Sequence, residues 1–156
     1  MAAVDSQNRE LTIKRRIDAP PAPVWRAWTE PDLLKRWFAP APWTTSHAEL
    51  DVRPGGASLI VMRGPDGAEF PNRGVYLEVT PQRRLVFTDA FVRAWEPSEH
   101  PFMTVIVTLE PEDAWTLYTA KVLHWTVADR ERHEQMGFHD GWGRCADQLG
   151  VVAQSI

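Results

Sequence analysis

The residues in this sequence that could carry out chemistry are a single cysteine, five histidines and a few polar side chains within apolar stretches. On a helix, Cys145 and His139 lie about 120° apart, so this histidine does not face the thiol as a base. A nucleophilic cysteine needs an identified base, and free cysteine is among the most often buried residue types. Cys145 is therefore predicted to be a core residue.

The other common motifs of catalysis and metal binding give little support. His124, His133 and His139 include no pair at i,i+4 spacing, which argues against a metal site. No serine lies in a nucleophile-elbow motif. Gly55 and Gly56 lie between two predicted strands, so no helix N-terminus could receive a phosphate there, and the pair is predicted to form a structural turn. We assign no catalytic residue, no metal ligand and no cofactor.

Polar side chains on strands that face an apolar core are better candidates for a functional site. If Val105 and Val107 point inward, the neighbouring strand should direct Tyr118, Val122 and His124 to the same side of the sheet. This placement brings His124 near the first turns of the last predicted helix.

Tyr76 and Glu78 share one face of a strand if its alternation is regular, but which face points inward is left open. In one interpretation, Tyr76 and Tyr118 are amphipathic core residues and Glu78 lies at an edge. In the other, Tyr76, Glu78, Tyr118 and His124 converge on one ligand, as a few polar groups do in an otherwise apolar pocket. A buried glutamate near a histidine would also have a shifted pKa and could act as an acid or a base.

These candidates depend on the C-terminal segment for their positions. An amphipathic helix is predicted from Asp129, whose side chain can cap its N-terminus, to Val152. Because each interior glycine costs about 1 kcal/mol relative to alanine, this glycine-rich helix should form only where something packs against it. Its apolar stripe consists of Phe138, Trp142, Cys145, Leu149 and Val152, and its glycines are Gly137, Gly141, Gly143 and Gly150.

The remaining elements precede this helix. Alternation from Glu10 to Ile17 predicts a strand, the prolines after Ala19 begin a short helix, and Thr29 caps a second one that ends before Pro40. Further strands are predicted over residues 46–52, 57–63, 74–79, 84–91, 102–110 and 115–125. One strand, two short helices, a meander of strands and a long helix form an α+β domain.

The composition limits the class of protein. With 156 residues, of which 44% are hydrophobic, we expect one domain over residues 10–154 after a disordered tail over residues 1–9. The 17 basic and 21 acidic residues argue against a nucleic-acid partner, which would need a basic surface. No apolar run approaches membrane-spanning length, and the single cysteine suits a reducing compartment, so a cytoplasmic protein with no membrane partner is expected.

The element order and a set of short motifs together identify a family resemblance. The motifs are Ala19-Pro20 with Val24-Trp25, Trp37-Phe38-Ala39-Pro40, Asp51-Val52-Arg53-Pro54-Gly55-Gly56, Gly74-Val75-Tyr76-Leu77-Glu78-Val79, Arg84-Leu85-Val86-Phe87-Thr88, His124, and Gly137-Phe138-His139-Asp140-Gly141-Trp142 leading to Leu149. In this order they resemble the helix-grip or START-like superfamily, also called SRPBCC, and within it the branch named after the homologue of the heat-shock chaperone ATPase activator. The resemblance implies a helix-grip fold, in which a curved antiparallel sheet of about seven strands surrounds the long C-terminal helix and leaves a cavity between them. The two short helices follow the first strand.

The superfamily uses this cavity for lipids, hormones, polyketides and other apolar molecules. We therefore predict a protein that binds a small apolar ligand, hydrophobic or aromatic, lipid or polyketide-like, and we lean away from an enzyme. Two alternatives stay open: an acid–base enzyme of the polyketide cyclase or hydrolase type, and a modulator of a chaperone or another partner protein. A homodimer is also left open. The candidate cavity residues are Trp37, Tyr76, Glu78, Phe87, Val105, Val107, Tyr118, Val122, His124, Met136, His139 and Trp142.

The distribution of side-chain volume along the last helix predicts where the cavity opens. Space should open near Met136 and His139, where glycines replace larger side chains, and close towards Leu149. The loop over residues 92–101 is long for a hairpin connection, so we expect it to border the cavity mouth, with Trp95 and Phe102 beside it.

Overall fold

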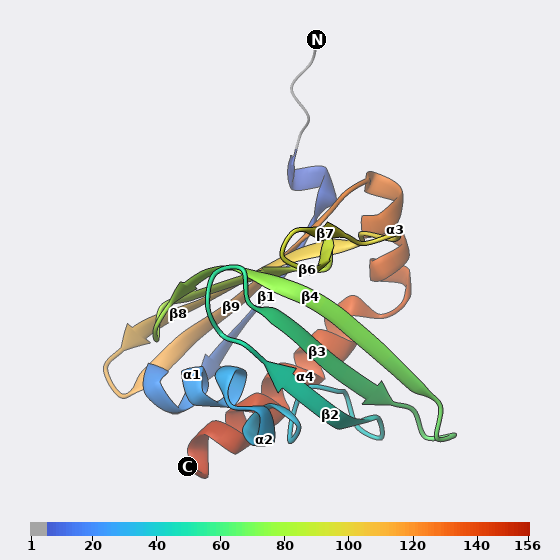
Figure 1. Ribbon diagram of the computed structural model, residues 1–156. Helices are drawn as coiled ribbons and strands as arrows, with labels where there is room; N and C mark the ends of the chain where they lie inside the picture. The colour runs from blue at the N-terminus through green and yellow to red at the C-terminus, as the bar shows by residue number, and fades with distance from the viewer. Residues whose placement is uncertain (1–5) are drawn as a thin grey trace.

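A seven-stranded antiparallel sheet curves around the C-terminal helix (Figure 1). The structure is a computed structural model that describes residues 6–156. The strand order is β1-β9-β8-β5-β4-β3-β2, so the first and last strands are neighbours. The strands are β1 (Glu10–Ile17), β2 (Thr44–Leu50), β3 (Ala57–Arg63), β4 (Glu69–Thr80), β5 (Arg84–Thr88), β8 (Met103–Glu112) and β9 (Trp115–His124). This arrangement confirms the predicted α+β helix-grip fold.

Two short helices follow β1, as predicted. Helix α1 (Pro21–Thr29) has proline in its first turn, and α2 (Pro31–Leu34) comes directly after Glu30. The prediction that Thr29 caps the second helix was wrong, because its hydroxyl donates to the carbonyl oxygen of Trp25 at 2.8 Å and Glu30 occupies the cap position. No helix within residues 6–156 is long and apolar enough to cross a membrane.

The C-terminal segment is two helices, α3 (Val127–Gln135) and α4 (Phe138–Gln154), and not the single helix predicted. Gly137 lies between them with a φ of 95°, a left-handed conformation that ends a helix and that glycine adopts without steric cost. The first helix also begins earlier than predicted. Its cap is Thr126, whose side chain accepts a hydrogen bond from the backbone N–H of Asp129 at 3.0 Å.

The alternation of the two longest central strands directs one face of each into the core. In the register of β8 and β9, Val105 faces Val122 and Leu109 faces Tyr118, and all four are at most 2% exposed. This register confirms the predicted inward direction of both strands. The buried residues with which α4 covers this face are Phe138, Ala146, Leu149, Val152 and Ala153.

The turn between β2 and β3 uses its glycines for backbone geometry. Gly55 has a φ of 82°, and its N–H donates to the Tyr76 carbonyl oxygen at 2.7 Å. The N–H of Gly56 donates to the Arg53 carbonyl oxygen at 2.8 Å, and a Cβ at this position would collide with the carbonyl of Asp51. Both N–H groups already have protein partners, which confirms the structural turn and leaves neither donor for a phosphate.

Two segments predicted to be irregular contain short elements. After β5, the chain forms a separate two-stranded ribbon of β6 (Phe91–Arg93) and β7 (Glu96–Pro97). At the other end, Ser6–Arg9 forms a 3-10 turn, η1, which packs against α3. The rest of the predicted tail, residues 1–5, lies outside the described residues.

Candidate functional site

A cavity of about 710 Å³ lies between the inner face of the sheet and α4. This volume falls within the range of roughly 300–1,000 Å³ that is typical of small-molecule sites. Much of the wall is aromatic. The aromatic residues that line it are Trp28, Trp37, Phe38, Tyr76, Phe87, Phe102, Tyr118, Phe138 and Trp142.

Where α1 meets the sheet, the wall is a cluster of aromatic rings. The ring centroids of Trp28 and Trp37 are 4.7 Å apart, and Phe87 lies 5.6 Å from Trp28. Trp37 Nε1 donates to the Ala27 carbonyl oxygen at 2.9 Å. The Nε1–H of Trp28 is buried and has no hydrogen-bond partner in residues 6–156.

Burial holds several polar groups of the wall in their neutral forms, since it disfavours the charged form of each. It raises the pKa of the Tyr118 hydroxyl, and burial together with the Asp51 charge raises the pKa of Tyr76. It also raises the pKa of the Cys145 thiol to about 12. Because the thiolate is the reactive form, Cys145 is a poor nucleophile at neutral pH, in agreement with a packing role.

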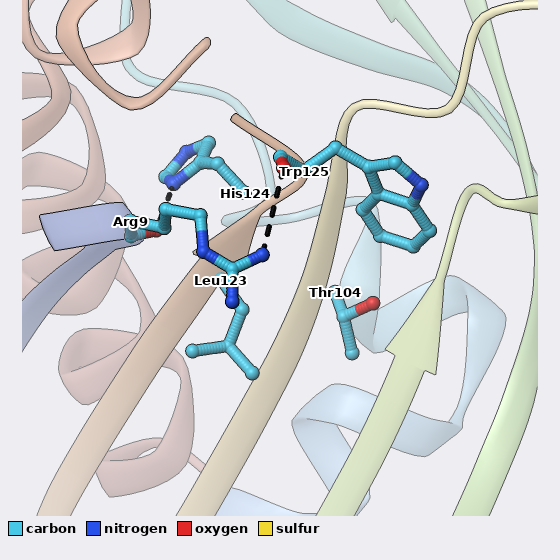
Figure 2. Close-up of a pocket in the computed structure, with 5 residues that line it drawn as sticks. All are labelled: Arg9, Thr104, Leu123, His124 and Trp125. Carbon is cyan, nitrogen blue, oxygen red and sulfur yellow. Dashed lines mark hydrogen bonds between the residues drawn. The ribbon is translucent and has the colours of Figure 1, made fainter. Parts of the chain in front are cut away.

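A chain of hydrogen bonds through two histidines connects the cavity wall to the N-terminal turn. His124 Nδ1 lies 2.8 Å from the backbone carbonyl oxygen of Arg9 (Figure 2), and His124 Nε2 lies 2.9 Å from His133 Nδ1. At the cavity, the indole Nε1–H of Trp142 donates to His133 Nε2 at 3.4 Å. Strand β9 and helices α3 and α4 therefore each contribute one side chain to this hydrogen-bond chain.

The hydrogen-bond chain assigns a role to every ring nitrogen. A carbonyl oxygen can only accept, so the proton of His124 is on Nδ1, and its Nε2 accepts from the Nδ1–H of His133. His133 Nε2 is then an acceptor, which matches the indole donor of Trp142. His133 is neutral in this arrangement, because a proton added to its Nε2 would face the indole N–H of Trp142.

The surroundings of His133 also favour its neutral form. Burial is the main cause that lowers the pKa of His133 to about 4, and the neighbouring His124 and Arg132 lower it further. The rings of Phe102 and Phe138 both lie 5.1 Å from the His133 ring, so its environment is largely aromatic. At neutral pH, His133 therefore offers an uncharged acceptor at the cavity wall.

Part of the predicted set of binding residues lies in this wall. The predicted residues that line the cavity are Trp37, Tyr76, Phe87, Val105, Tyr118, Met136 and Trp142. Val107 and Val122 are at most 2% exposed and belong to the core outside the wall. His124 is buried and reaches the wall only through its hydrogen bond to His133.

Glu78 and His139 lie outside the cavity, and their predicted placement is corrected. A β-bulge between Tyr76 and Glu78 shifts the register of β4 against β5, so Tyr76 points inward while Glu78 pairs with Arg84 at 2.6 Å on the exposed side. His139 is exposed at the start of α4, where it lies 3.5 Å from Glu134. Regular alternation and a single continuous helix, the assumptions behind both placements, fail at these points.

Many residues of the cavity wall were not among those predicted, and Trp28, Asp89 and His133 are examples. Asp89 follows β5 directly, and its Oδ1 accepts the backbone N–H groups of Phe102 at 2.8 Å and Met103 at 3.0 Å. An aspartate at the end of a strand is a recognisable turn signal, so this role could have been found in the sequence. The position of His133 could not, because it depends on the break before α4.

The segment between β5 and β8 borders the cavity, as expected. Val92, His100 and Phe102 line it. Trp95 does not, because it is 63% exposed and its ring packs 5.5 Å from Phe91 within the ribbon. The ribbon therefore holds Trp95 away from the cavity while the residues on both sides of it contribute to the wall.

A second, smaller pocket of about 280 Å³ lies on the opposite face of the sheet near the end of β9. Figure 2 shows the side chain of Arg9 extending towards Leu123, with Thr104 and Trp125 nearby. The Nη1 of Arg9 lies 3.5 Å from the Trp125 carbonyl oxygen, a long contact. This pocket shares His124 with the hydrogen-bond chain but lies on the far side of the sheet from the cavity.

Comparison with known proteins agrees with this fold. The family described as "Activator of Hsp90 ATPase homolog 1-like protein" matches residues 18–154. The chain belongs to this family. The matched range includes every residue of the cavity wall.

Solved structures resemble the chain over nearly its whole length. A crystal structure of a protein from Nitrosomonas europaea is 43% identical, covers 97% of both chains and has a TM-score of 0.93. One from Mycobacterium smegmatis is 23% identical, with 95% and 92% coverage and a TM-score of 0.79. A solution structure of an AHSA1-like protein from Aeromonas hydrophila is 22% identical, with 94% and 92% coverage and a TM-score of 0.70. The last two show the fold alone. Comparison with curated proteins gave no match.

Proposed function

We propose that this protein binds one uncharged, largely apolar small molecule in the cavity. The observation that carries the proposal is a cavity of about 710 Å³ with a largely apolar wall that is rich in aromatic rings. Tyr118, Cys145 and His133 interrupt this wall, and burial favours the neutral form of each at pH 7. Because an unpaired charge is costly in an apolar environment, such a wall favours a ligand without one.

The charged residues of the lining, Arg73 and Asp89, do not alter this expectation for the body of the ligand. β4 pairs Val75 with Thr88, which places Arg73 near Asp89 at the end of β5. The Oδ1 of Asp89 is already occupied by two backbone N–H groups. Both residues lie towards the segment that borders the cavity, so a charged substituent would be accommodated only there.

An acid–base enzyme has weaker support. Glu78, the carboxylate that this alternative required, pairs with Arg84 on the exposed side of the sheet. His133 has an available acceptor, but its pKa is about 4. Transfer of a proton to it from a hydroxyl with a pKa near 10 would cost about 8 kcal/mol. The wall is therefore better suited to recognise a hydroxyl than to deprotonate it.

The third alternative is modulation of a chaperone. It rests on the description of the family and not on the chemistry of the cavity. A stable complex with a chaperone ATPase that persists when the cavity is filled would favour it over ligand binding.

The cavity can be filled by substitution at one glycine. Gly141 of α4 lines the cavity, and a Cβ built there meets nothing within 4 Å. Gly141→Phe should therefore extend its ring from an unobstructed Cβ into cavity volume, and Gly141→Ala is a matched control that adds little volume. We expect the neutral fluorescent probe N-phenyl-1-naphthylamine to bind the unmodified protein and Gly141→Ala similarly, and Gly141→Phe at least about tenfold more weakly. Equal affinity for all three proteins would contradict the proposal.

A further inference from the structure

The hydrogen-bond roles of His133 and Trp142 indicate which functional group a ligand carries into the wall. His133 Nε2 can only accept, and Trp142 Nε1 can only donate. Their mutual hydrogen bond is 3.4 Å long, beyond the roughly 2.7–3.2 Å of a well-formed bond, so each atom is weakly satisfied. Both residues line the cavity, which leaves an acceptor and a donor side by side for a ligand.

A hydroxyl group matches this pair better than other common polar groups. Its O–H can donate to His133 Nε2 while its oxygen accepts from the Nε1–H of Trp142. A carbonyl or an ether offers no proton to Nε2, and an ammonium offers no acceptor to the indole. A carboxylate would bring a charge into this largely aromatic part of the wall.

The groups around the pair favour an aromatic body for the same ligand. The Phe138 and Trp142 ring centroids are 5.4 Å apart with an interplanar angle of 33°, and Phe102 lies 5.1 Å from the His133 ring. A flat ring that carries the hydroxyl would therefore meet aromatic surface on the strand side and on the helix side.

The pair can separate to admit a hydroxyl without movement of the core. Helix α3 carries His133 and has no buried residue. It joins α4 at Gly137, whose left-handed backbone ends one helix before the next begins. A small displacement of α3 would therefore widen the gap between His133 and Trp142 and leave the packing of α4 intact.

We propose that the cavity binds an uncharged hydroxylated aromatic molecule, with its hydroxyl between His133 Nε2 and Trp142 Nε1. The inference rests on the proposed function, because it names the ligand class of the same cavity. His133 Nε2 and Trp142 Nε1 distinguish this class from aromatic ketones, ethers and carboxylates. These molecules fill the same volume but can form a hydrogen bond with at most one of the two atoms.

Three probes with one ring system test the inference: 2-naphthol, 2-methoxynaphthalene and 2-naphthoate. Their affinities are measured by isothermal titration calorimetry near pH 7.5, where the naphthol is neutral. We expect 2-naphthol to bind about tenfold tighter than the ether, the effect of about one net hydrogen bond, and the carboxylate to bind most weakly. In His133→Phe and in Trp142→Phe, the preference for the naphthol over the ether should fall to within about twofold.

Matched substitutions outside the cavity serve as controls. His47→Phe and Trp125→Phe repeat the same chemical changes at an exposed β2 residue and at a residue beyond β9, and both should keep the preference for the naphthol. Circular dichroism shows whether each variant is folded. If His133→Phe does not fold, the test rests on Trp142→Phe.

The outcomes separate this inference from the proposed function. If the naphthol and the ether bind equally, the hydroxyl site is wrong while binding of an uncharged molecule in the cavity stands. If the carboxylate binds best, both the hydroxyl site and the uncharged ligand of the proposed function are wrong. If the naphthol preference survives in His133→Phe and Trp142→Phe, another group recognises the hydroxyl and the assignment is overturned. If no probe binds, the proposed function fails and this inference fails with it.

Discussion

His133 is the residue through which the cavity wall, α3 and the N-terminal turn are connected. Its Nδ1 bonds to His124, and His124 in turn bonds to the carbonyl of Arg9. A parallel contact joins the same elements, because Arg130 Nε donates to the Asn8 carbonyl oxygen at 3.0 Å. A change in the protonation of His133 would therefore disturb the contact of α3 with η1 as well as the cavity wall.

Acidification should destabilise the protein through this residue. The pKa of His133 is about 4 in the folded state, below the 6.5 of an unperturbed histidine. As the pH falls, His133 takes up its proton in the unfolded chain before it does so in the folded protein. The stability that neutral His133 contributes to the folded state is therefore complete above about pH 6.5 and is lost as the pH falls towards 4. The loss should be well below the roughly 3 kcal/mol that the full shift corresponds to, because solvent screens this half-buried ring. Urea unfolding across this pH range measures it, and His133→Phe should flatten the profile. An equally steep profile in that variant would exclude His133 as the cause.

Leu149 and Met136 should differ in their effects on stability. Leu149 is completely buried in the core, whereas Met136 lines the cavity and is 71% exposed. Leu149→Ala should therefore lower the free energy of unfolding by about 2–5 kcal/mol, as core deletions do. Met136→Ala should have a much smaller effect on stability and act mainly on probe affinity. Calorimetric unfolding compares the two, and a larger loss from Met136→Ala would reverse this assignment of core and cavity.

At the scale of elements, the break between α3 and α4 separates a packed helix from a surface helix. Helix α4 buries residues such as Phe138 and Leu149, while α3 buries none and is held by hydrogen bonds and by contacts with aromatic rings. The left-handed backbone of Gly137 separates the two helices. Gly141, one turn into α4, leaves space for the cavity. The two glycines therefore have different physical reasons for lacking a side chain.

Alanine substitution at these two glycines should shift stability in opposite directions. A Cβ at either position meets nothing within 4 Å, so only backbone effects differ. Gly141→Ala should stabilise by up to about 1 kcal/mol, because alanine has the higher helix propensity. Gly137→Ala should destabilise by about 1–2 kcal/mol, because φ is 95° there. Urea unfolding of both variants provides the measurement, and the same sign of change at both positions would refute the argument.

At the scale of the whole molecule, the cavity lies between parts that differ in how firmly they are held. The inner face of the sheet and α4 form one continuous core, whereas His133 and Met136 reach the cavity from the less buried α3 side. Ligand exchange should therefore proceed by displacement of α3, because moving α4 would disrupt the core.

Hydrogen exchange should detect this difference. We expect the backbone amides of α3 to exchange faster than those of α4 in the free protein, because α3 has no buried residue. Saturation with 2-naphthol should slow exchange in α3 and leave α4 nearly unchanged. Slower exchange in β2 or β3 without any change in α3 would place the entrance at the β2 edge of the sheet.

Much of the fold follows from patterns that the sequence contains locally. The alternation in Met103–Glu112 and Trp115–His124 identifies which side chains face the core, because burial on one face of a sheet requires that period. Proline and glycine punctuation places the short helices and the turn at Gly55. The same patterns indicate that the glycine-rich amphipathic helix packs against the sheet, whereas the cavity between them was implied by the family resemblance.

Only the tertiary structure decides which polar groups meet at the wall. The bulge after Tyr76 reverses the direction of Glu78, and a bulge depends on pairing with a neighbouring strand. The left-handed backbone at Gly137 sets α3 apart from α4 and brings His133 against His124 and Trp142. Periodicity in a sequence reports the burial of one element at a time. Hydrogen bonds between three elements depend on how those elements dock, and docking is settled by the packing of the whole chain.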